Sequence, residues 1–271
     1  MVIRNIIKVC SAFALVVSIA WLIADFGYEP LFGAFGSTAA LAGCFVSEKI
    51  KKHRYQRENA QHFYGKIAEH YDERNTKFLK ESHLSTVKHL KEAVQHTDEA
   101  VILDLGGGTG INVAAHFFNR PKVTWNYVDF TPEMKVAFEK NVASADFKYT
   151  ATTSDLNQYL NQCNEKFDAV VISFVLTSLP YPLDMNKVVD LLNDDGSLVI
   201  ADIEPQYTAK HPEYAVKVNG EVHSLSVSPV NALELIEAAS DVGLRLHFCQ
   251  SIKKHDGERY AYVLRFKKDA S

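Results

Sequence analysis

Short apolar runs alternate with amphipathic segments along most of the chain. From Ala100 onward, each apolar run is followed by a stretch whose apolar residues recur at helical spacing. This pattern predicts helices after Gly110, Pro132, Ser154 and Leu183, and strands at Val101–Leu105, Val123–Asp129, Phe147–Thr150, Phe167–Ser173 and Ser197–Ile203. Such alternation predicts an α/β fold in which a parallel sheet is covered by helices on both faces.

The segments on either side of this region follow other patterns. Residues 58–95 are polar with apolar side chains at helical spacing, which predicts two or three helices. Near the C-terminus, a helix over about Val230 to Val242 precedes two alternating runs around a turn at Asp256-Gly257. These runs predict an antiparallel hairpin at one edge of a doubly wound sheet.

The N-terminal residues are apolar and basic. Two uncharged runs, Val9–Ala24 and Pro30–Ser47, are separated by a short acidic segment and flanked by basic residues. If Lys8 extends to the lipid headgroups, the first helix reaches ~20 residues, enough to cross a bilayer, and the positive-inside rule keeps both termini in the cytoplasm. The predicted organisation at the inner (cytoplasmic) membrane is a transmembrane helical hairpin over 1–47, a basic juxtamembrane linker over 48–58 and a globular body over 59–271.

Two other interpretations of the apolar runs remain open. A cleaved signal peptide requires a small-x-small site, which Ser18-Ile-Ala20 matches poorly because more apolar residues follow it. A buried helical pair of a soluble protein is the second, since the second run is rich in glycine and alanine. In a membrane, the spacing of Gly36 and Ala40 allows close helix packing, so an oligomer formed through the hairpin is a further expectation.

Charge divides the chain in the same place. The net charge is −4, but residues 1–57 carry seven basic and three acidic side chains, a net +4, which leaves −8 for the remainder. An acidic body repels phosphates, so we expect no nucleic-acid partner. The four cysteines lack metal-ligand or CxxC spacing, and we expect neither a disulfide nor a bound metal.

The segment VILDLGGGTG, residues 101–110, carries the clearest chemical signal. An apolar strand ends at Asp104, and the glycines after it allow a tight turn with close backbone approach to a ligand. The next strand ends in Asp129, 23 residues beyond Gly106. A carboxylate at this point can accept hydrogen bonds from both hydroxyls of an adenosine ribose. The carboxyl edge of the sheet is therefore the predicted ligand site.

Five segments, VILDLGGGTG, NYVDFTPEM, Asp155-Leu156, FDAVVISFVLTSL and LLNDDGSLVIADIEP, occur in an order and spacing that resemble the class I S-adenosylmethionine-dependent methyltransferases. The upstream stretch AEHYDERN resembles the entry helix of the subgroup that methylates quinones and other small molecules. The resemblance covers about residues 60–267. It implies S-adenosylmethionine as the cofactor and a Rossmann-like, seven-stranded, mostly parallel sheet with the antiparallel hairpin at its C-terminal edge.

The resemblance also implies a set of cofactor contacts. The methionine portion of the cofactor is approached by Asp104, Gly106, Gly108 and Gly110, and the ribose hydroxyls bind Asp129. The adenine is contacted by Phe130, Met134, Asp155 and Leu156, and the sulfonium end by Ser173, Phe174 and Tyr71.

Little catalytic machinery is expected. A sulfonium is already an activated methyl donor, so the protein must align the acceptor and exclude water. A general base is needed only if the acceptor loses a proton on attack, and the weak candidates are His70, His211, His223 and Tyr207. For each of them, a solvated or packing role stands beside the catalytic one. His211 and His223 lie in the insert between the fifth strand and the last helix, which in this family often covers the substrate.

Three other functions compete with this interpretation. The string DLGGGTG also occurs in actin-like ATPases, but there it joins two strands, whereas INVAAHFF here predicts a helix. A nicotinamide-dependent dehydrogenase also uses a glycine-rich turn and a ribose-binding acid, but the third glycine of its motif is replaced by Ile111. A membrane-tethered sensor or degenerate methyltransferase would hold the cofactor without methyl transfer.

Residues 173–176 read Ser-Phe-Val-Leu, not the Asn/Asp-Pro-Pro-Tyr of methyltransferases that act on amino groups and nucleic-acid bases. This argues against methylation of DNA adenine or glutamine and leaves an oxygen, carbon or sulfur acceptor, or none. A membrane anchor raises the effective concentration of the body near lipids and quinones. The sequence therefore predicts a membrane-anchored methyltransferase that acts on a lipophilic or membrane-associated small molecule.

Overall fold

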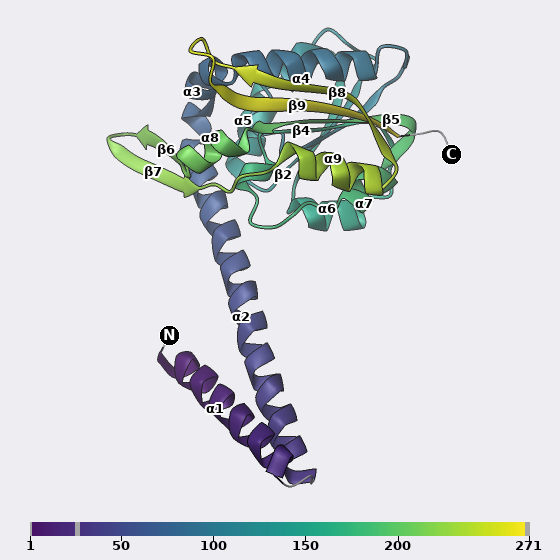
Figure 1. The fold of residues 1–271 in the computed structure, drawn as a ribbon. Coiled ribbons are helices and arrows are strands. Elements are labelled where there is room, and N and C mark those ends of the chain that lie inside the picture. The colour runs from purple at the N-terminus through teal and green to yellow at the C-terminus, as the bar shows by residue number, and fades with distance from the viewer. Residues whose placement is uncertain (1, 25–27, 269–271) are drawn as a thin grey trace. The chain divides into compact units, whose positions relative to one another are not determined.

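The computed structural model describes residues 2–24 and 28–268 and divides the chain into two units. The head comprises Met1–Glu58 and the body Asn59–Ser271. Figure 1 shows the body as a sheet with helices on both faces and the head as two helices. The two units are described separately below.

The head consists of α1 (Val2–Ala24) and most of α2 (Tyr28–Ile67). The acidic segment between the predicted spans falls partly on residues 25–27, outside the described residues. Large apolar side chains of both helices are exposed, among them Phe13 at 71% and Phe35 at 77%. In the described part of the chain, no helix is long and apolar enough to span a membrane.

The prediction of a transmembrane hairpin is therefore not supported. The second predicted span, Pro30–Ser47, does not end as a separate helix at its basic flank. α2 continues through the whole linker, with its cluster of lysines and arginines, as far as Ile67. The linker expected over 48–58 is thus part of one 40-residue helix.

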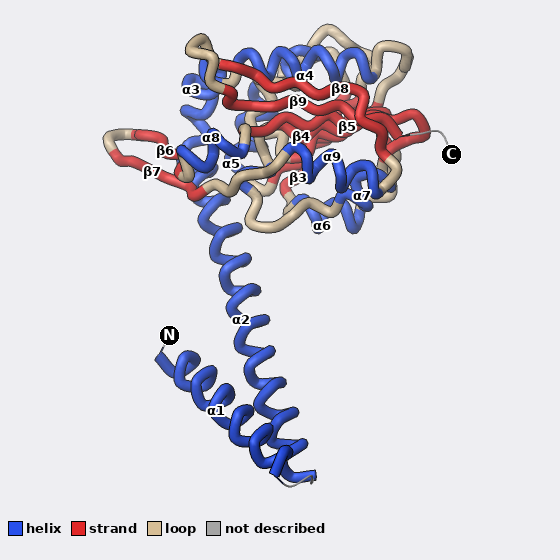
Figure 2. Tube along the Cα trace, in the orientation of Figure 1, coloured by secondary structure: helices blue, strands red, loops and turns tan. Residues whose placement is uncertain are grey.

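The body contains a seven-stranded sheet in the order β3-β2-β1-β4-β5-β9-β8, drawn as red strands in Figure 2. All neighbouring pairs from β3 to β5 are parallel, and β9 runs antiparallel to both β5 and β8. The strands are β1 (Val101–Leu105), β2 (Thr124–Asp129), β3 (Lys148–Thr153), β4 (Phe167–Ser173), β5 (Leu192–Ile203), β8 (Leu244–Lys253) and β9 (Arg259–Lys268). This confirms the predicted sheet and its antiparallel edge.

Helices cover both faces because consecutive strand residues point to opposite sides. Ile102 of β1 packs in one apolar cluster, and Leu103 packs in a second. The first cluster includes buried residues of α4 (Lys80–Ala93) and α5 (Pro132–Asn141). The second includes residues of α6 (Leu156–Gln162), α7 (Met185–Asp190) and α9 (Ala232–Asp241). The central strands are therefore buried on both faces.

One predicted helix does not form as an α-helix. After the glycine-rich turn, the structure has turns and a short 3₁₀ segment, η2 (Ala114–Phe117), where a helix starting near Ile111 was expected. The segment between Gly110 and Pro121 is short and contains β-branched and aromatic residues, which are weak helix formers. The prediction was wrong in type although it located the element correctly.

The structure also contains a small hairpin that was not predicted. β6 (Glu213–Val218) and β7 (Glu221–Ser226) pair antiparallel after α8 (Pro205–Lys210). Their turn is Asn219-Gly220, with φ of +51° and +91°. An Asn-Gly pair between alternating runs is a strong hairpin signal, so the sequence did contain the information.

Three short elements of the described chain remain. η1 (Ala68–His70) and α3 (Tyr71–Phe78) follow α2, and η3 (Leu176–Ser178) follows β4. Residues 60–68 pack with Met134 of α5 and with buried residues of β6 and β7 in a third apolar cluster. This cluster holds the start of the body and the small hairpin beside the carboxyl edge of the sheet.

Candidate functional site

The glycine-rich turn lies at the end of β1 and is fixed to β2. The Gly106 amide donates a hydrogen bond to the Val128 carbonyl at 2.7 Å, and Gly106 has a φ of +74°. A Cβ at Gly106 would lie 2.5 Å from Val175 Cγ2, whereas one at Gly108 would meet nothing within 4 Å. The turn therefore requires glycine at 106 for packing, while Gly108 faces open space.

Asp129 lies directly beside this turn. The Gly108 amide donates to Asp129 Oδ2 at 3.1 Å, and the Thr131 amide donates to Oδ1 at 2.8 Å. The side chain is buried, with 6% of its surface exposed. Burial raises the pKa of Asp129 to about 6, against the two backbone donors that lower it. The carboxylate is thus held in a fixed orientation at the carboxyl edge of β2.

A narrow cavity of about 50 Å³ opens between these elements. Nine residues assigned to the cofactor by the sequence line it: Tyr71, Gly106, Gly108, Asp129, Phe130, Met134, Leu156, Ser173 and Phe174. The sequence analysis missed Tyr64, Val175, Ser178 and Leu179, which line it as well. Val175, Ser178 and Leu179 follow β4 within or beside the quoted FDAVVISFVLTSL segment, so their proximity to Phe174 was the available signal.

Three of the assigned residues lie elsewhere. Asp104 is buried beneath the turn and accepts a hydrogen bond from Trp125 Nε1 at 3.2 Å. Gly110 packs near Phe138, which lies 2.5 Å from the position of an added Cβ. Asp155 caps α6 by accepting from the Gln158 amide, and it also accepts from Tyr181. None of the three lines the described cavity, so contacts of these residues with the cofactor stay a prediction.

The lining fits S-adenosylmethionine in its chemistry. Ser173 Oγ is buried and has no hydrogen-bond partner in the part of the chain that the structure describes. A buried hydroxyl without a partner is costly, and a bound polar ligand would satisfy it. Asp129 provides the carboxylate for ribose hydroxyls, and Phe130, Met134 and Leu156 provide an apolar surface for a flat base.

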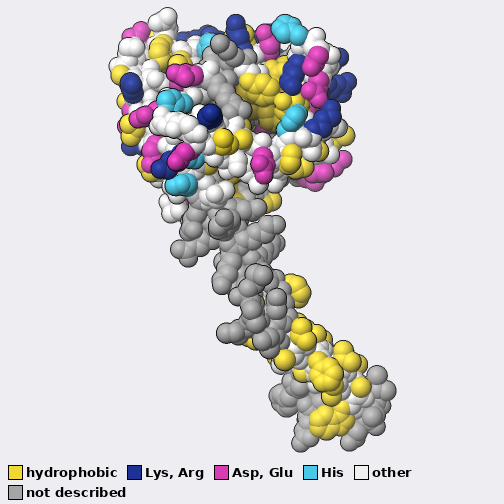
Figure 3. Space-filling model, turned by 90° about the vertical axis from the view of Figure 1, so that its left-hand side faces the viewer, with side chains coloured by type: hydrophobic (Ala, Val, Ile, Leu, Met, Phe, Trp, Pro, Cys, Tyr) yellow, Lys and Arg dark blue, Asp and Glu magenta, His cyan; other side chains and the backbone are white. Residues whose placement is uncertain are grey.

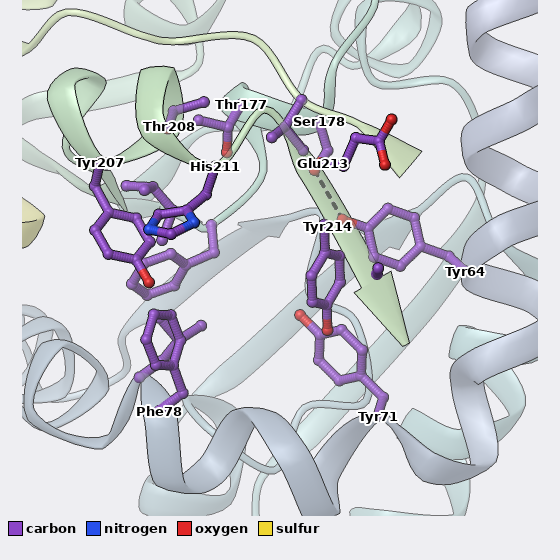
Figure 4. Close-up of a pocket in the computed structure, with 15 residues that line it drawn as sticks. Tyr64, Tyr71, Phe78, Thr177, Ser178, Tyr207, Thr208, His211, Glu213 and Tyr214 are labelled. Atoms are coloured by element: carbon purple, nitrogen blue, oxygen red, sulfur yellow. Dashed lines mark hydrogen bonds between the residues drawn. The ribbon is translucent and has the colours of Figure 1, made fainter. Parts of the chain in front are cut away.

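A second and larger cavity, of about 320 Å³, adjoins the first and shares Tyr64, Tyr71, Phe174 and Ser178 with it. Figure 4 shows two groups of rings facing one another across this cavity, with Tyr64, Tyr71 and Tyr214 in one and Phe78, Tyr207 and His211 in the other. Figure 3 shows a hollow lined by hydrophobic side chains on one face of the body. A molecule in this cavity would lie next to whatever occupies the first one.

Two of the four weak catalytic candidates line a cavity, and two do not. Tyr207 and His211 line the larger cavity, and their rings pack with centroids 4.5 Å apart. His70 in η1 and His223 in β7 line neither cavity. The insert therefore does border the larger cavity, through α8 and the start of β6.

Residues 59–79 close the site from one side. Gln61 Nε2 donates to the Phe130 carbonyl at 2.8 Å, Tyr64 Oη pairs with Ser178 Oγ at 2.8 Å, and Thr109 donates to Asp72. These bonds connect the start of the body to the segments after β1, β2 and β4. Tyr64 and Tyr71 of this segment therefore form one wall of the cavity.

Asp104 makes the stability of the folded protein depend on pH. Burial raises the pKa of Asp104 to about 7, although the Trp125 hydrogen bond lowers it. In the folded state the group keeps its proton up to about pH 7, whereas the unfolded chain loses it near pH 4. The folded state thus binds more protons within this window, so the contribution of Asp104 to stability falls as pH rises from 4 to 7.

We expect an Asp104→Asn variant to lose this pH dependence, because the amide cannot ionise. Its stability relative to the parent should rise by about 1.4 kcal/mol per pH unit within the window. Urea unfolding of both proteins at pH 5 and pH 8 measures the difference. A stability difference that is equal at both pH values would show that Asp104 ionises normally in the folded protein.

Comparison with known proteins agrees with the geometry. A model of the methyltransferase-domain family matches residues 68–247. A solved S-adenosylmethionine-dependent methyltransferase from Clostridium acetobutylicum is 15% identical, with a TM-score of 0.56, and the match covers 76% of this chain and 99% of that one. No curated protein matches the chain in sequence.

Two further solved structures share the fold. The N-methyltransferase NodS from Bradyrhizobium japonicum, in complex with S-adenosyl-L-homocysteine, is 14% identical, with a TM-score of 0.52 over 70% of this chain and 86% of that one. An O-methyltransferase family protein from Burkholderia thailandensis is 14% identical, with a TM-score of 0.56 over 75% and 60%. The family model, the strand order and the cavity lining lead to one conclusion: the chain belongs to the methyltransferase-domain family, and S-adenosylmethionine is its cofactor.

Proposed function

We propose that this protein transfers the methyl group of S-adenosylmethionine to a small, largely apolar molecule bound in the larger cavity. The observation that carries the proposal is the pair of adjoining cavities. The smaller has the carboxylate and glycine turn that suit a nucleoside, and the larger is lined mainly by rings. The oxygen, carbon or sulfur acceptor expected from the sequence remains a prediction, since the similar structures include both an N- and an O-methyltransferase.

The bound cofactor supplies a methyl group that is already activated for transfer. The protein contributes position and exclusion of water. Tyr64, Tyr71, Phe174 and Ser178 border both cavities and would hold the two reactants against one another. Burial raises the pKa of Tyr64 and Tyr71 well above the ordinary value, so both phenols stay neutral and act as hydrogen-bonding groups, not as bases.

Calorimetric titration of the full chain with S-adenosylmethionine and S-adenosylhomocysteine, with NAD and ATP as controls, tests the cofactor part. We expect micromolar binding of both sulfur compounds alone. Transfer of labelled methyl from the cofactor into a lipid extract then tests the reaction. Binding without transfer to any extract would favour the cofactor-binding sensor, and binding of NAD alone would favour the dehydrogenase.

We also propose that the head attaches the protein to a membrane. Exposed large apolar side chains on α1 include Val9, Phe13 and Val16, each at least 66% exposed. Exposed apolar surface of this extent marks an interaction site, and the lysines and arginines of 48–58 suit anionic headgroups, at about 1 kcal/mol each. The expected location is the inner (cytoplasmic) membrane, with the body in the cytoplasm.

Deleting residues 1–47 should release the protein from membranes and leave the cofactor site intact, because every residue lining both cavities lies in the body. The measurements are flotation with anionic vesicles and calorimetry with S-adenosylhomocysteine. We expect the full chain to float, and the shortened chain to stay in solution and bind with unchanged affinity. A shortened chain that is unfolded would show that the head is part of the core.

A further inference from the structure

Several aromatic rings line the larger cavity. The centroids of Tyr64 and Tyr71 are 6.3 Å apart, and those of Phe78 and Tyr207 are 6.0 Å apart. Figure 4 shows Tyr71 and Tyr214 with their hydroxyl ends close together, across the cavity from Tyr207. Ring faces carry negative partial charge and attract cations within about 6 Å of their centroids. The rings therefore provide a surface that suits a compact cation.

The charged groups around the cavity agree with this. Among the fifteen described residues that line it, none is lysine or arginine, and the one carboxylate is Glu213. Lys254 is not among the lining residues. Its ammonium bonds to Tyr207 Oη at 3.1 Å, pairs with Glu258 at 3.2 Å, and lies 4.3 Å from the centroid of the Tyr207 ring and 5.6 Å from that of Phe78. A carboxylate or phosphate in the cavity would find no cation among the lining residues to bind it.

Asp129, which lines the smaller cavity, adds to the negative potential beside Tyr64 and Tyr71. Burial is the main cause that raises the pKa of Tyr64 and Tyr71, and the charge of Asp129 raises both further. Burial and the charge of Asp129 disfavour the anionic forms of Tyr64 and Tyr71, and they would disfavour a bound anion at this junction for the same reasons.

We propose that the methyl acceptor is an aliphatic amine, held against the rings of Tyr64, Tyr71 and Tyr214. This inference rests on the proposed function and differs from the oxygen, carbon or sulfur acceptor expected from the sequence. The missing Asn/Asp-Pro-Pro-Tyr motif argues against adenine and glutamine nitrogens, whose lone pairs are delocalised. The lone pair of an aliphatic amine is not delocalised, so that argument does not extend to it.

The reaction is balanced without a buried base. The bound ammonium first loses one proton to water at the open side of the cavity, where His211 and Glu213 are exposed. The nitrogen lone pair then forms the new bond to the methyl carbon while the carbon–sulfur bond breaks and sulfur keeps the bonding pair. The methylated nitrogen carries the positive charge and leaves as an ammonium ion. The rings stabilise the cation that forms, because their attraction increases as the charge moves onto nitrogen.

The binding test uses three probes of similar size on the full chain saturated with S-adenosylhomocysteine. These are benzyltrimethylammonium, benzyl alcohol and benzoate. We expect benzyltrimethylammonium to bind about fivefold or more tightly than benzyl alcohol, and benzoate to bind weakest. Equal affinities, or tightest binding of benzoate, would overturn the inference.

Two pairs of variants locate the effect. Tyr214→Leu and Tyr71→Leu remove a ring, and the matched Tyr214→Phe and Tyr71→Phe keep it. The leucine variants should lose about threefold or more in ammonium affinity, and the phenylalanine variants should not. The two tyrosines lie on different elements, β6 and α3, so one pair suffices if a variant of the other melts early. Equal loss in leucine and phenylalanine variants would show that the rings do not bind the cation.

Transfer of labelled methyl to N-methylbenzylamine, compared with benzyl alcohol and benzoate at equal concentration, completes the test. The amine should be the preferred acceptor. If S-adenosylhomocysteine binds but the amine is not preferred, the inference fails and the methyltransferase proposal stands. If S-adenosylhomocysteine itself does not bind, both fail.

Discussion

A Gly106→Ala variant is expected to lose cofactor binding and to unfold more easily than the parent protein. Gly106 has a φ of +74°, which costs an L-residue about 1–2 kcal/mol. In addition, the new Cβ would lie 2.5 Å from Val175 Cγ2 and 2.9 Å from Cγ1, so the chain after β4 must shift. Overpacking of this kind costs about 1–3 kcal/mol more. Since Val175 lines the cofactor cavity, the shift also distorts the site.

Variants of two other glycines distinguish the effect of backbone strain on stability from the effect on cofactor binding. Gly220, in the turn between β6 and β7, has a φ of +91° and no atom within 4 Å of an added Cβ, so Gly220→Ala should lose stability but keep cofactor affinity. Gly108 also has open space around its Cβ position but lines the cavity, so Gly108→Ala should weaken binding at a similar cost in stability. Denaturant unfolding and calorimetry are the measurements. Normal affinity in both Gly106→Ala and Gly108→Ala would remove the turn from the cofactor site.

An Asp129→Ala variant should bind S-adenosylmethionine about tenfold or more weakly, because hydrogen bonds to a charged acceptor contribute about 1.5–3 kcal/mol each. The matched control is Asp155→Ala. Both residues are carboxylates assigned to the cofactor by sequence, but only Asp129 lines the cavity, whereas Asp155 caps α6. Calorimetry of both variants should show a large loss for the first and less than about a twofold loss for the second. The reverse result would place the adenosine near α6.

The same carboxyl should make binding depend on pH. Burial raises the pKa of Asp129 to about 6, so the free protein carries a neutral carboxyl below this pH and an acceptor of full charge above it. Affinity for S-adenosylhomocysteine should therefore fall as pH decreases through 6. The Asp129→Ala variant should lack that inflection. An unchanged inflection in the variant would assign it to another group.

The central strands of the sheet could be predicted because they coincide with local runs of apolar residues. β1 and β4 begin and end where apolar runs begin and end, since both are buried on both faces and read as continuous apolar segments. A helix was predicted after the glycine turn from the apolar residues of that segment. These residues are buried by packing in the core without forming an α-helix. Ala114 and Phe117 are fully buried in a 3₁₀ turn. In the head, both predicted apolar segments are helical, but the second helix continues to Ile67 and the predicted membrane spans are not supported.

The sequence by itself determined the strand segments of the parallel sheet, the glycine turn and Asp129, because each depends on residues close together in the chain or on a spacing of about one βαβ unit. Only the tertiary structure decided that Asp104 and Asp155 are bonded elsewhere, and that Tyr64 and Ser178, 114 positions apart, meet between the two cavities. Side chains from α2, α3, α8 and β6 form the acceptor cavity together. Contacts between residues far apart in sequence depend on how elements pack, and no local pattern specifies them.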